Sequence, residues 1–170
     1  VFDANKLDWL QGQWIRKISI KEFAERILPI VAEKVPAANA DKDFERKAAL
    51  SHERITFFHE ATDRMGFFYE TPNVSKELMA SAKQKVTMED LPTILTTLED
   101  LLEAIPAEEW AGERILNDVK ASLEGNGFKL GQLLWPLRAL LTGREYSPGA
   151  VEVAEVLGKK ETLKRLKNAQ

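Results

Sequence analysis

The sequence predicts an all-α protein. Apolar residues recur at steps of three and four along most of its 170 residues, the spacing that places them on one face of a helix. No segment shows the sustained alternation of apolar and polar residues that is typical of a half-buried strand. Proline, glycine and asparagine fall mainly between the helical segments, where they end helices or form turns.

Two helices are predicted in the first part of the chain. Ser19 and Glu22 fit a capping box, and the helix that follows them is expected to stop near Pro36. A second helical pattern covers residues 41–61. The turn residues Thr-Pro-Asn at 71–73 then predict a change of subdomain.

The second part of the chain predicts a series of helices, and the one over residues 91–105 has the strongest apolar face. The others cover residues 78–82, 110–123, 130–141, 147–157 and 160–166. Glycines are expected to end helices at residues 125–127, at Gly143 and at Gly158, because glycine adopts a left-handed conformation at little cost. Pro136 lies inside a helical pattern and predicts a kink or a restart there.

Composition limits the classes of function. With 44% hydrophobic and 30% charged residues, the chain has the make-up of a folded globular protein. Its apolar runs are far shorter than the roughly 20 residues that cross a bilayer, so we expect no membrane association. Absence of cysteine excludes disulfides, and no secretion signal opens the chain, so we expect a cytoplasmic protein. Because the first residue is Val1 rather than methionine, we expect an excised fragment.

The formal net charge of −3 conceals a segregation of charge. Residues 86–113 hold eight acids and no base, so the remainder carries 24 bases against 19 acids. From Trp135 onward there are seven bases against four acids, an excess that could face phosphates. Charge alone favours the alternative, an ordinary solvated helical surface.

Motifs of common catalytic sites are absent from the sequence. There is no Gly-x-x-x-x-Gly-Lys-Ser/Thr phosphate loop. His52 and His59 lie seven residues apart on one predicted helical segment, with Asp63 four residues beyond, but without a cysteine or a carboxylate cluster beside them structural histidines are favoured. The carboxylates of residues 99–103 are interpreted as solubilising. We therefore assign no catalytic residue and no metal site.

Three stretches resemble a known family. Residues 2–16, Phe-Asp-Ala-Asn-Lys-Leu-Asp-Trp-Leu-Gln-Gly-Gln-Trp-Ile-Arg, resemble the Phe-Asp-x-x-Lys-Leu-x-Trp-x-Asn-x-x-Tyr-Ile-Arg segment of bacterial glutamyl-tRNA synthetases. Residues 129–159, with Pro-Leu-Arg-Ala-Leu-Leu-Thr-Gly at 136–143, resemble that family's C-terminal Pro-Leu-Arg-x-Ala-Leu-Thr-Gly block. Between them, residues 49–60 resemble its Arg-Ile/Val/Phe-x-Thr-Leu-x-Glu helix, with Arg54 at the arginine and Glu60 at the glutamate.

The resemblance implies the C-terminal half of a class I aminoacyl-tRNA synthetase that ligates glutamate to tRNA(Glu). The fold would be an α-helical cage of two anticodon-binding subdomains, residues 1–73 and 74–170, with residues 1–18 at the junction with the stem-contacting region. The chain would bind the anticodon loop of tRNA(Glu) as a monomer and would not aminoacylate alone. It would hold no cofactor, because ATP and Mg²⁺ belong to the N-terminal catalytic domain that is its partner in the parent enzyme.

The resemblance also assigns roles to residues. Arg54 matches the arginine that reads the last anticodon base, and a guanidinium can donate two hydrogen bonds to acceptors there. In the family this arginine accompanies rejection of the glutamine tRNA, so Arg54 favours a discriminating enzyme. The alternative is an ion pair on the helix surface with Glu53 or nearby acids.

The second subdomain supplies the other predicted contacts. Arg138, Ser147, Pro148 and Gly149 match positions that line the family's anticodon pocket, and Arg144 of the same block is predicted to bind tRNA. For Ser147 the alternative is a helix N-cap, with Pro148 in the first turn of that helix.

In the first segment, Lys6 matches the lysine near the tRNA backbone, where its loss would weaken binding without altering sequence choice. Trp9 and Trp14 could stack on unpaired bases. Their position beside Leu7 and Leu10 favours burial in the core instead. The acidic block is expected to face away from the RNA.

The alternative class of function is a helical protein-interaction module without RNA affinity. An independent small enzyme is the third class, and no site in the sequence supports it. Salt separates the first two classes, because binding to an anticodon loop weakens steeply as ionic strength rises, whereas apolar protein binding does not.

Overall fold

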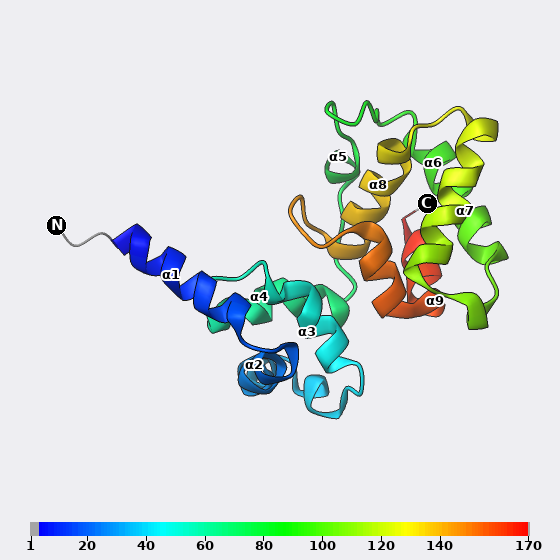
Figure 1. The fold of residues 1–170 in the computed structure, drawn as a ribbon. Helices are drawn as coiled ribbons and strands as arrows, with labels where there is room; N and C mark the ends of the chain where they lie inside the picture. The colour runs from blue at the N-terminus through cyan, green and yellow to red at the C-terminus, as the bar shows by residue number, and fades with distance from the viewer. Residues whose placement is uncertain (1–3, 170) are drawn as a thin grey trace. The chain divides into compact units, whose positions relative to one another are not determined.

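The computed structural model describes residues 4–169 and divides the chain into two compact units, Val1–Glu70 and Thr71–Gln170. Both units are helical in their described parts (Figure 1). The N-terminal unit contains α1 (Ala4–Lys17), α2 (Ile20–Lys34), η1 (Pro36–Ala40), α3 (Phe44–His52), η2 (Phe58–Glu60), α4 (Ala61–Met65) and η3 (Gly66–Phe68). The all-α prediction is thus confirmed for residues 4–169, which span the described parts of both units.

Helix α2 forms the centre of the N-terminal unit. Its N-cap is the predicted one, because the Ser19 hydroxyl accepts a hydrogen bond from the Glu22 backbone N–H at 3.1 Å. Its buried side chains recur at helical spacing and pack against α3 and α4: Phe23, Ala24, Ile27 and Val31. The apolar periodicity therefore identified the correct face of this helix.

The prediction of one helical segment over residues 41–61 is wrong. α3 ends at His52, and η2 and α4 follow only after a non-helical stretch at residues 53–57. Ile55 and Thr56 in this stretch are β-branched and propagate a helix poorly. In addition, the Thr56 N–H donates to the Glu60 carboxylate at 3.3 Å. The stretch still reaches the core, since Ile55 is 1% exposed.

Helix α1 is attached to the rest of its unit through its C-terminal half. Ile15 is fully buried, and its carbonyl oxygen lies 2.7 Å from Nε2 of the buried His52 on α3. The N-terminal half extends beyond α2, α3 and α4 (Figure 1), and residues 6–10 are all exposed. One helix is therefore half packed and half solvated.

A polar cluster in the N-terminal unit consists of Asp41, Lys47 and Tyr69. The Asp41 carboxylate accepts hydrogen bonds from the Tyr69 hydroxyl and from Lys47 Nζ, both at 2.7 Å. Burial works to raise the pKa of Asp41, but these donors outweigh it and hold the pKa below its ordinary value of 3.8. Burial and the neighbouring Asp41 raise the pKa of Tyr69 well above its ordinary value. The cluster joins the segment before α3 to the end of the unit.

The C-terminal unit contains α5 (Lys76–Met79), α6 (Leu91–Ala104), η4 (Ala107–Glu109), α7 (Gly112–Asn126), α8 (Leu130–Thr142) and α9 (Ala150–Asn168). Helix α8 packs against all of the other α-helices of this unit. Ser81 and Val86 form an isolated antiparallel bridge between α5 and α6.

The predicted glycine stops are confirmed. Gly127 follows α7 with φ +75°, and Gly143 follows α8 with φ +65°. Gly158, with φ +79° and ψ 160°, breaks α9 into two helical halves. Pro136 does not restart its helix, because α8 continues through it as one element.

We expect Tyr69→Phe to destabilise the protein by about 1 kcal/mol at pH 7, because it removes a partly buried hydrogen bond to a charged group. The native pKa of Asp41 is lowered, so the stabilisation is present above the unfolded value and is lost as the pH falls through the native one. The difference in the free energy of unfolding, measured in urea, should therefore shrink as the pH falls below 3.8, the ordinary value for an aspartate, and through the lowered native pKa of Asp41.

The matched control is Tyr146→Phe, which alters the chain's other tyrosine, whose side chain is 76% exposed. This variant should have the same free energy of unfolding as the parent, both at pH 7 and at the lower pH. An equal loss of stability in the two variants would contradict the assignment to the Asp41 cluster.

Candidate nucleic-acid interface

Arg54 lies on the turn that directly follows α3 and is exposed. Its backbone N–H donates to the Ser51 carbonyl at 2.9 Å, and Arg16 Nε donates to the carbonyl of the adjacent Glu53 at 3.3 Å. The turn is therefore held from α1 as well as from α3. Among the residues that the structure describes, the Arg54 guanidinium has no ion pair or hydrogen bond, so the alternative of a pair with Glu53 or nearby acids is not observed.

The remaining candidates in the N-terminal unit lie on α1. Lys6 is exposed in its solvated half. Trp9 is 59% exposed and Trp14 is 42% exposed, so the expectation that both are core residues is wrong. Trp9 lies in the solvated half of α1, where residues 6–10 are all exposed, and Trp14 lies off the buried face that Gly12 and Ile15 occupy. Trp14 contacts Phe58 edge-on, with ring centroids 6.0 Å apart.

Arg138 lies on α8 and is held by two contacts. Its guanidinium carbon lies 4.5 Å from the centroid of the Trp135 ring, and its Nη2 donates to the Glu145 carbonyl at 2.8 Å. Trp135 is in turn fixed by its own Nε1, which donates to the Leu78 carbonyl at 3.2 Å. These contacts connect α5, α8 and the segment after α8.

The other predicted contacts share the loop between α8 and α9, residues 143–149. The Arg144 N–H donates to the Thr142 hydroxyl at 3.3 Å, and the Ser147 hydroxyl donates to the Pro148 carbonyl at 3.1 Å. Pro148 is buried. The structure therefore brings Arg144, Ser147, Pro148 and Gly149 into one loop, to which Arg138 is hydrogen-bonded.

The expectation that Ser147 caps a helix is wrong. α9 begins at Ala150 with Gly149 as its N-cap, two residues later than the Ser-Pro pair suggested. The Gly149 N–H donates to the Glu152 carboxylate at 2.9 Å, which supplies the acidic half of a capping interaction. The Ser147 side chain therefore does not cap α9.

Much of the basic excess at the C-terminus is used within the protein. Lys159 Nζ donates to the carbonyls of Glu103 and Ile105 at 2.8 and 2.5 Å, at the C-terminal end of α6. Lys167 lies 3.4 Å from Glu103 and 3.5 Å from Glu99, and the charge of Glu103 raises its pKa. Arg165 is buried and donates to the Leu141 carbonyl at 2.6 Å. These cations therefore do not form a free surface for phosphates.

The histidines show no arrangement of metal ligands. His52 ends α3 and His59 lies in η2, so they do not share a helix, and the His59 ring stacks on Phe57 with centroids 5.5 Å apart. Within residues 4–169, no group of three potential His, Cys, Asp or Glu ligands lies close enough to hold a metal ion.

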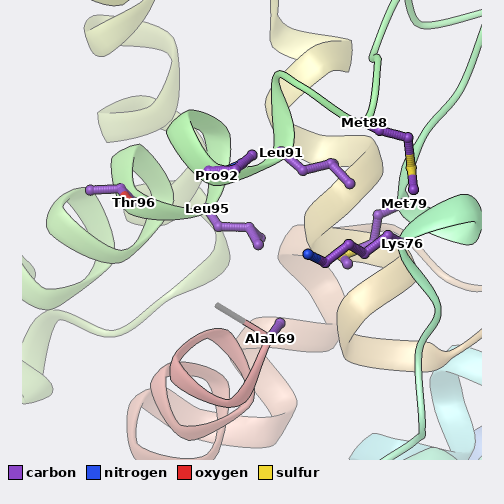
Figure 2. A pocket seen from close by; sticks show the side chains of 8 residues that line it. All are labelled: Lys76, Met79, Met88, Leu91, Pro92, Leu95, Thr96 and Ala169. Carbon is purple, nitrogen blue, oxygen red and sulfur yellow. The ribbon is translucent and has the colours of Figure 1, made fainter.

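A pocket in the C-terminal unit lies beside α5 and α6 and contains none of the predicted site residues (Figure 2). The lining is mainly apolar and carries one lysine and one threonine: Lys76, Met79, Met88, Leu91, Pro92, Leu95, Thr96 and Ala169. None of these described lining residues is an acid or a histidine.

None of the helices in the described part of the chain is long and apolar enough to span a membrane.

Comparison with known proteins identifies the class of domain. The family described as the anticodon binding domain matches residues 22–170, so the chain belongs to this family. Among curated proteins, it is 35% identical over 169 residues to a glutamate–tRNA ligase of Clostridium botulinum strain Hall, covering 98% of this chain and 34% of that protein. The corresponding ligase of Clostridium tetani is 34% identical, with 98% and 33% covered.

Solved structures have the same fold. A glutamate–tRNA ligase from Elizabethkingia meningosepticum, solved in complex with its amino acid, matches with a TM-score of 0.77 at 26% identity, covering 99% of this chain and 32% of that one. The synthetase from Elizabethkingia anophelis matches in fold with a TM-score of 0.76 at 22% identity. The chain thus spans about a third of the length of the relatives that it matches.

Sequence reasoning did not single out Tyr146, the most exposed of the large hydrophobic side chains in the described residues. The signal was its position between Gly143 and Gly149, since exposed aromatic residues in glycine-bounded loops are available for binding. Arg16 was also missed, because its contact with Glu53 joins residues 37 positions apart.

We expect Gly143→Ala to destabilise the protein by more than about 2 kcal/mol. Besides the strain of a left-handed alanine, the new Cβ would lie 2.7 Å from Cβ of Pro72. Gly127→Ala is the control, because it has φ +75° and no neighbour within 4 Å of the new Cβ, so it should cost only about 1 kcal/mol. Urea unfolding measures both, and equal costs would contradict the close packing of the α8–α9 loop.

Proposed function

We propose that this chain recognises the anticodon loop of tRNA(Glu) as the C-terminal part of a glutamate–tRNA ligase. The observation that carries the proposal is the match of residues 22–170 to the anticodon binding domain family, together with relatives that are glutamate–tRNA ligases. The proposal is further supported by the exposed and unengaged guanidinium of Arg54.

Arg54 would read the last anticodon base. An arginine can donate two parallel hydrogen bonds to acceptors on a base edge, which distinguishes bases by the acceptors they present. Its turn is braced by Arg16 and by the Ser51 carbonyl, so the side chain projects from a defined backbone. Such preorganisation lowers the entropic cost of binding.

The α8–α9 loop would contact the other anticodon nucleotides. Arg138 uses one N–H on Glu145 and retains further donors for RNA, while Arg144 adds a second cation. The Ser147 hydroxyl, which donates to the Pro148 carbonyl, would accept a hydrogen bond from a base edge, and Pro148 and Gly149 would give shape to the pocket. On α1, Lys6 would approach the tRNA backbone, and the exposed Trp9 offers a ring for stacking.

The activity of the whole protein would come from its other part. The catalytic domain would bind ATP and Mg²⁺ and transfer glutamate to the tRNA, with this chain supplying anticodon recognition. We propose that the chain acts as a monomer in the cytoplasm, is not catalytic alone, and holds the acidic residues 86–113 away from the RNA.

The test is binding of the chain to two anticodon stem-loops, one glutamate-type and one glutamine-type, across a salt series. We expect a preference for the glutamate-type loop and an affinity that falls steeply with salt. Arg54→Ala should lose about 1–3 kcal/mol of that preference, because the discriminating hydrogen bonds are gone.

Arg114→Ala is a matched arginine control. Arg114 donates to Asp118 at 2.8 Å and also pairs with Glu109, in an acidic part of the chain, so its loss should leave binding unchanged. Equal binding of both loops by the parent chain would keep anticodon recognition and remove discrimination by Arg54. No binding to either loop at low salt would overturn the proposal for this chain and favour a protein-interaction module.

A further inference from the structure

Tyr146 lies in the α8–α9 loop and has no partner among the residues that the structure describes. Its side chain is 76% exposed, more than any other large hydrophobic side chain in the described residues. Within the same part of the chain, its ring makes no aromatic contact and its hydroxyl makes no hydrogen bond. An aromatic ring of this exposure is costly to hydrate and is available to a ligand.

The loop that carries Tyr146 is held at both ends. At its start, the Gly143 N–H donates to the Ala139 carbonyl at 2.7 Å. At its end, Pro148 is buried and the Gly149 N–H donates to Glu152 at 2.9 Å. Since the ends are fixed, the backbone beside the ring is positioned before any ligand arrives.

The residue next to Tyr146 is fixed from α8. The Glu145 carbonyl accepts from Arg138 Nη2 at 2.8 Å, and the Arg138 guanidinium stacks on the Trp135 ring at 4.5 Å. Trp135 is fixed to the Leu78 carbonyl by its indole N–H. Arg138 therefore determines where the peptide preceding Tyr146 lies.

We propose that Tyr146 stacks on an unpaired base of the bound RNA loop, and that Arg138 acts on this contact as a positioning residue through the Glu145 carbonyl. The inference rests on the proposed function. It adds a binding residue that neither the motifs nor the family resemblance had assigned, and a second role for Arg138.

The surroundings of Tyr146 favour a base over a protein partner. A protein interface needs a broad patch of roughly 800 Å² per partner, and Tyr146 is the only exposed large hydrophobic side chain in residues 143–149. A single ring is sufficient to stack on one base. Arg144, two residues before it, supplies positive charge for the adjoining phosphates.

The test compares Tyr146→Leu with Tyr146→Phe for binding to the glutamate-type anticodon stem-loop. We expect Tyr146→Leu to weaken binding about tenfold and Tyr146→Phe to stay within about twofold of the parent, because a phenyl ring retains the stacking face. The salt dependence should be unchanged in both, since no phosphate contact is lost. A stem-loop with 2-aminopurine at successive loop positions should show one position whose fluorescence differs between Tyr146→Leu and the parent.

The role of Arg138 is tested by combining substitutions. Arg138→Lys keeps the charge but loses the planar stack on Trp135 and the fork that reaches Glu145. We expect it to weaken binding, and we expect Tyr146→Leu to add little further loss in that background, because both act on the same contact. Full additivity would overturn the positioning role.

The outcomes separate this inference from the function on which it rests. Binding by the parent chain with its salt dependence, together with an unchanged affinity for Tyr146→Leu, overturns the stacking role alone. Failure of the parent chain to bind either stem-loop overturns both.

Discussion

The buried C-terminal end of α8 imposes the constraint on which the C-terminal unit depends. Residues 139–142 are all buried, yet the last carbonyls of a helix have no partner within it. The Ala139 and Leu141 carbonyls are satisfied by the Gly143 N–H at 2.7 Å and by Arg165 at 2.6 Å. Because an unpaired buried carbonyl costs about 1–3 kcal/mol, α9 must bring Arg165 to this point. Glu161, 2.9 Å from Arg165, balances the buried charge.

The cations of this unit also differ in the groups that the fold places beside them. Arg165, Lys159 and Lys167 stabilise helix ends and acidic neighbours inside the unit, whereas Arg138 and Arg144 lie where the chain turns between α8 and α9. A count of bases in the sequence cannot make this distinction, because it depends on which carbonyls and carboxylates the fold brings near each ammonium or guanidinium. For that reason, the excess of bases from Trp135 onward could not predict which of them are available to phosphates.

Signals from neighbouring residues in the sequence predicted most helices and their ends, but they did not predict contacts between residues far apart in the chain. The Ser19 cap and the stops at Gly127 and Gly143 depend on neighbouring residues only, and all three are observed. The break after His52 was missed because apolar residues continue through it, and Ile55 is buried without being helical. The exposure of Trp9 and Trp14 depends on which part and which face of α1 contact the rest of its unit, and local spacing misjudged it. Of the candidate site, the family resemblance identified Arg54 and Arg138. The hydrogen bonds from Arg16 to Glu53 and from Arg138 to Glu145 became visible only in the structure.

The division of α1 into a packed and a solvated half implies two different local stabilities in one helix. Isolated helices of this length are marginal in water, so the turns without tertiary contacts depend on the turns that have them. Amide hydrogens near Leu7 and Leu10 should exchange through local opening of the exposed turns, whereas those following the contact between the buried Ile15 and His52 should exchange only when the core opens. The packed half of α1 would thus act as the nucleus from which the exposed turns re-form after they open.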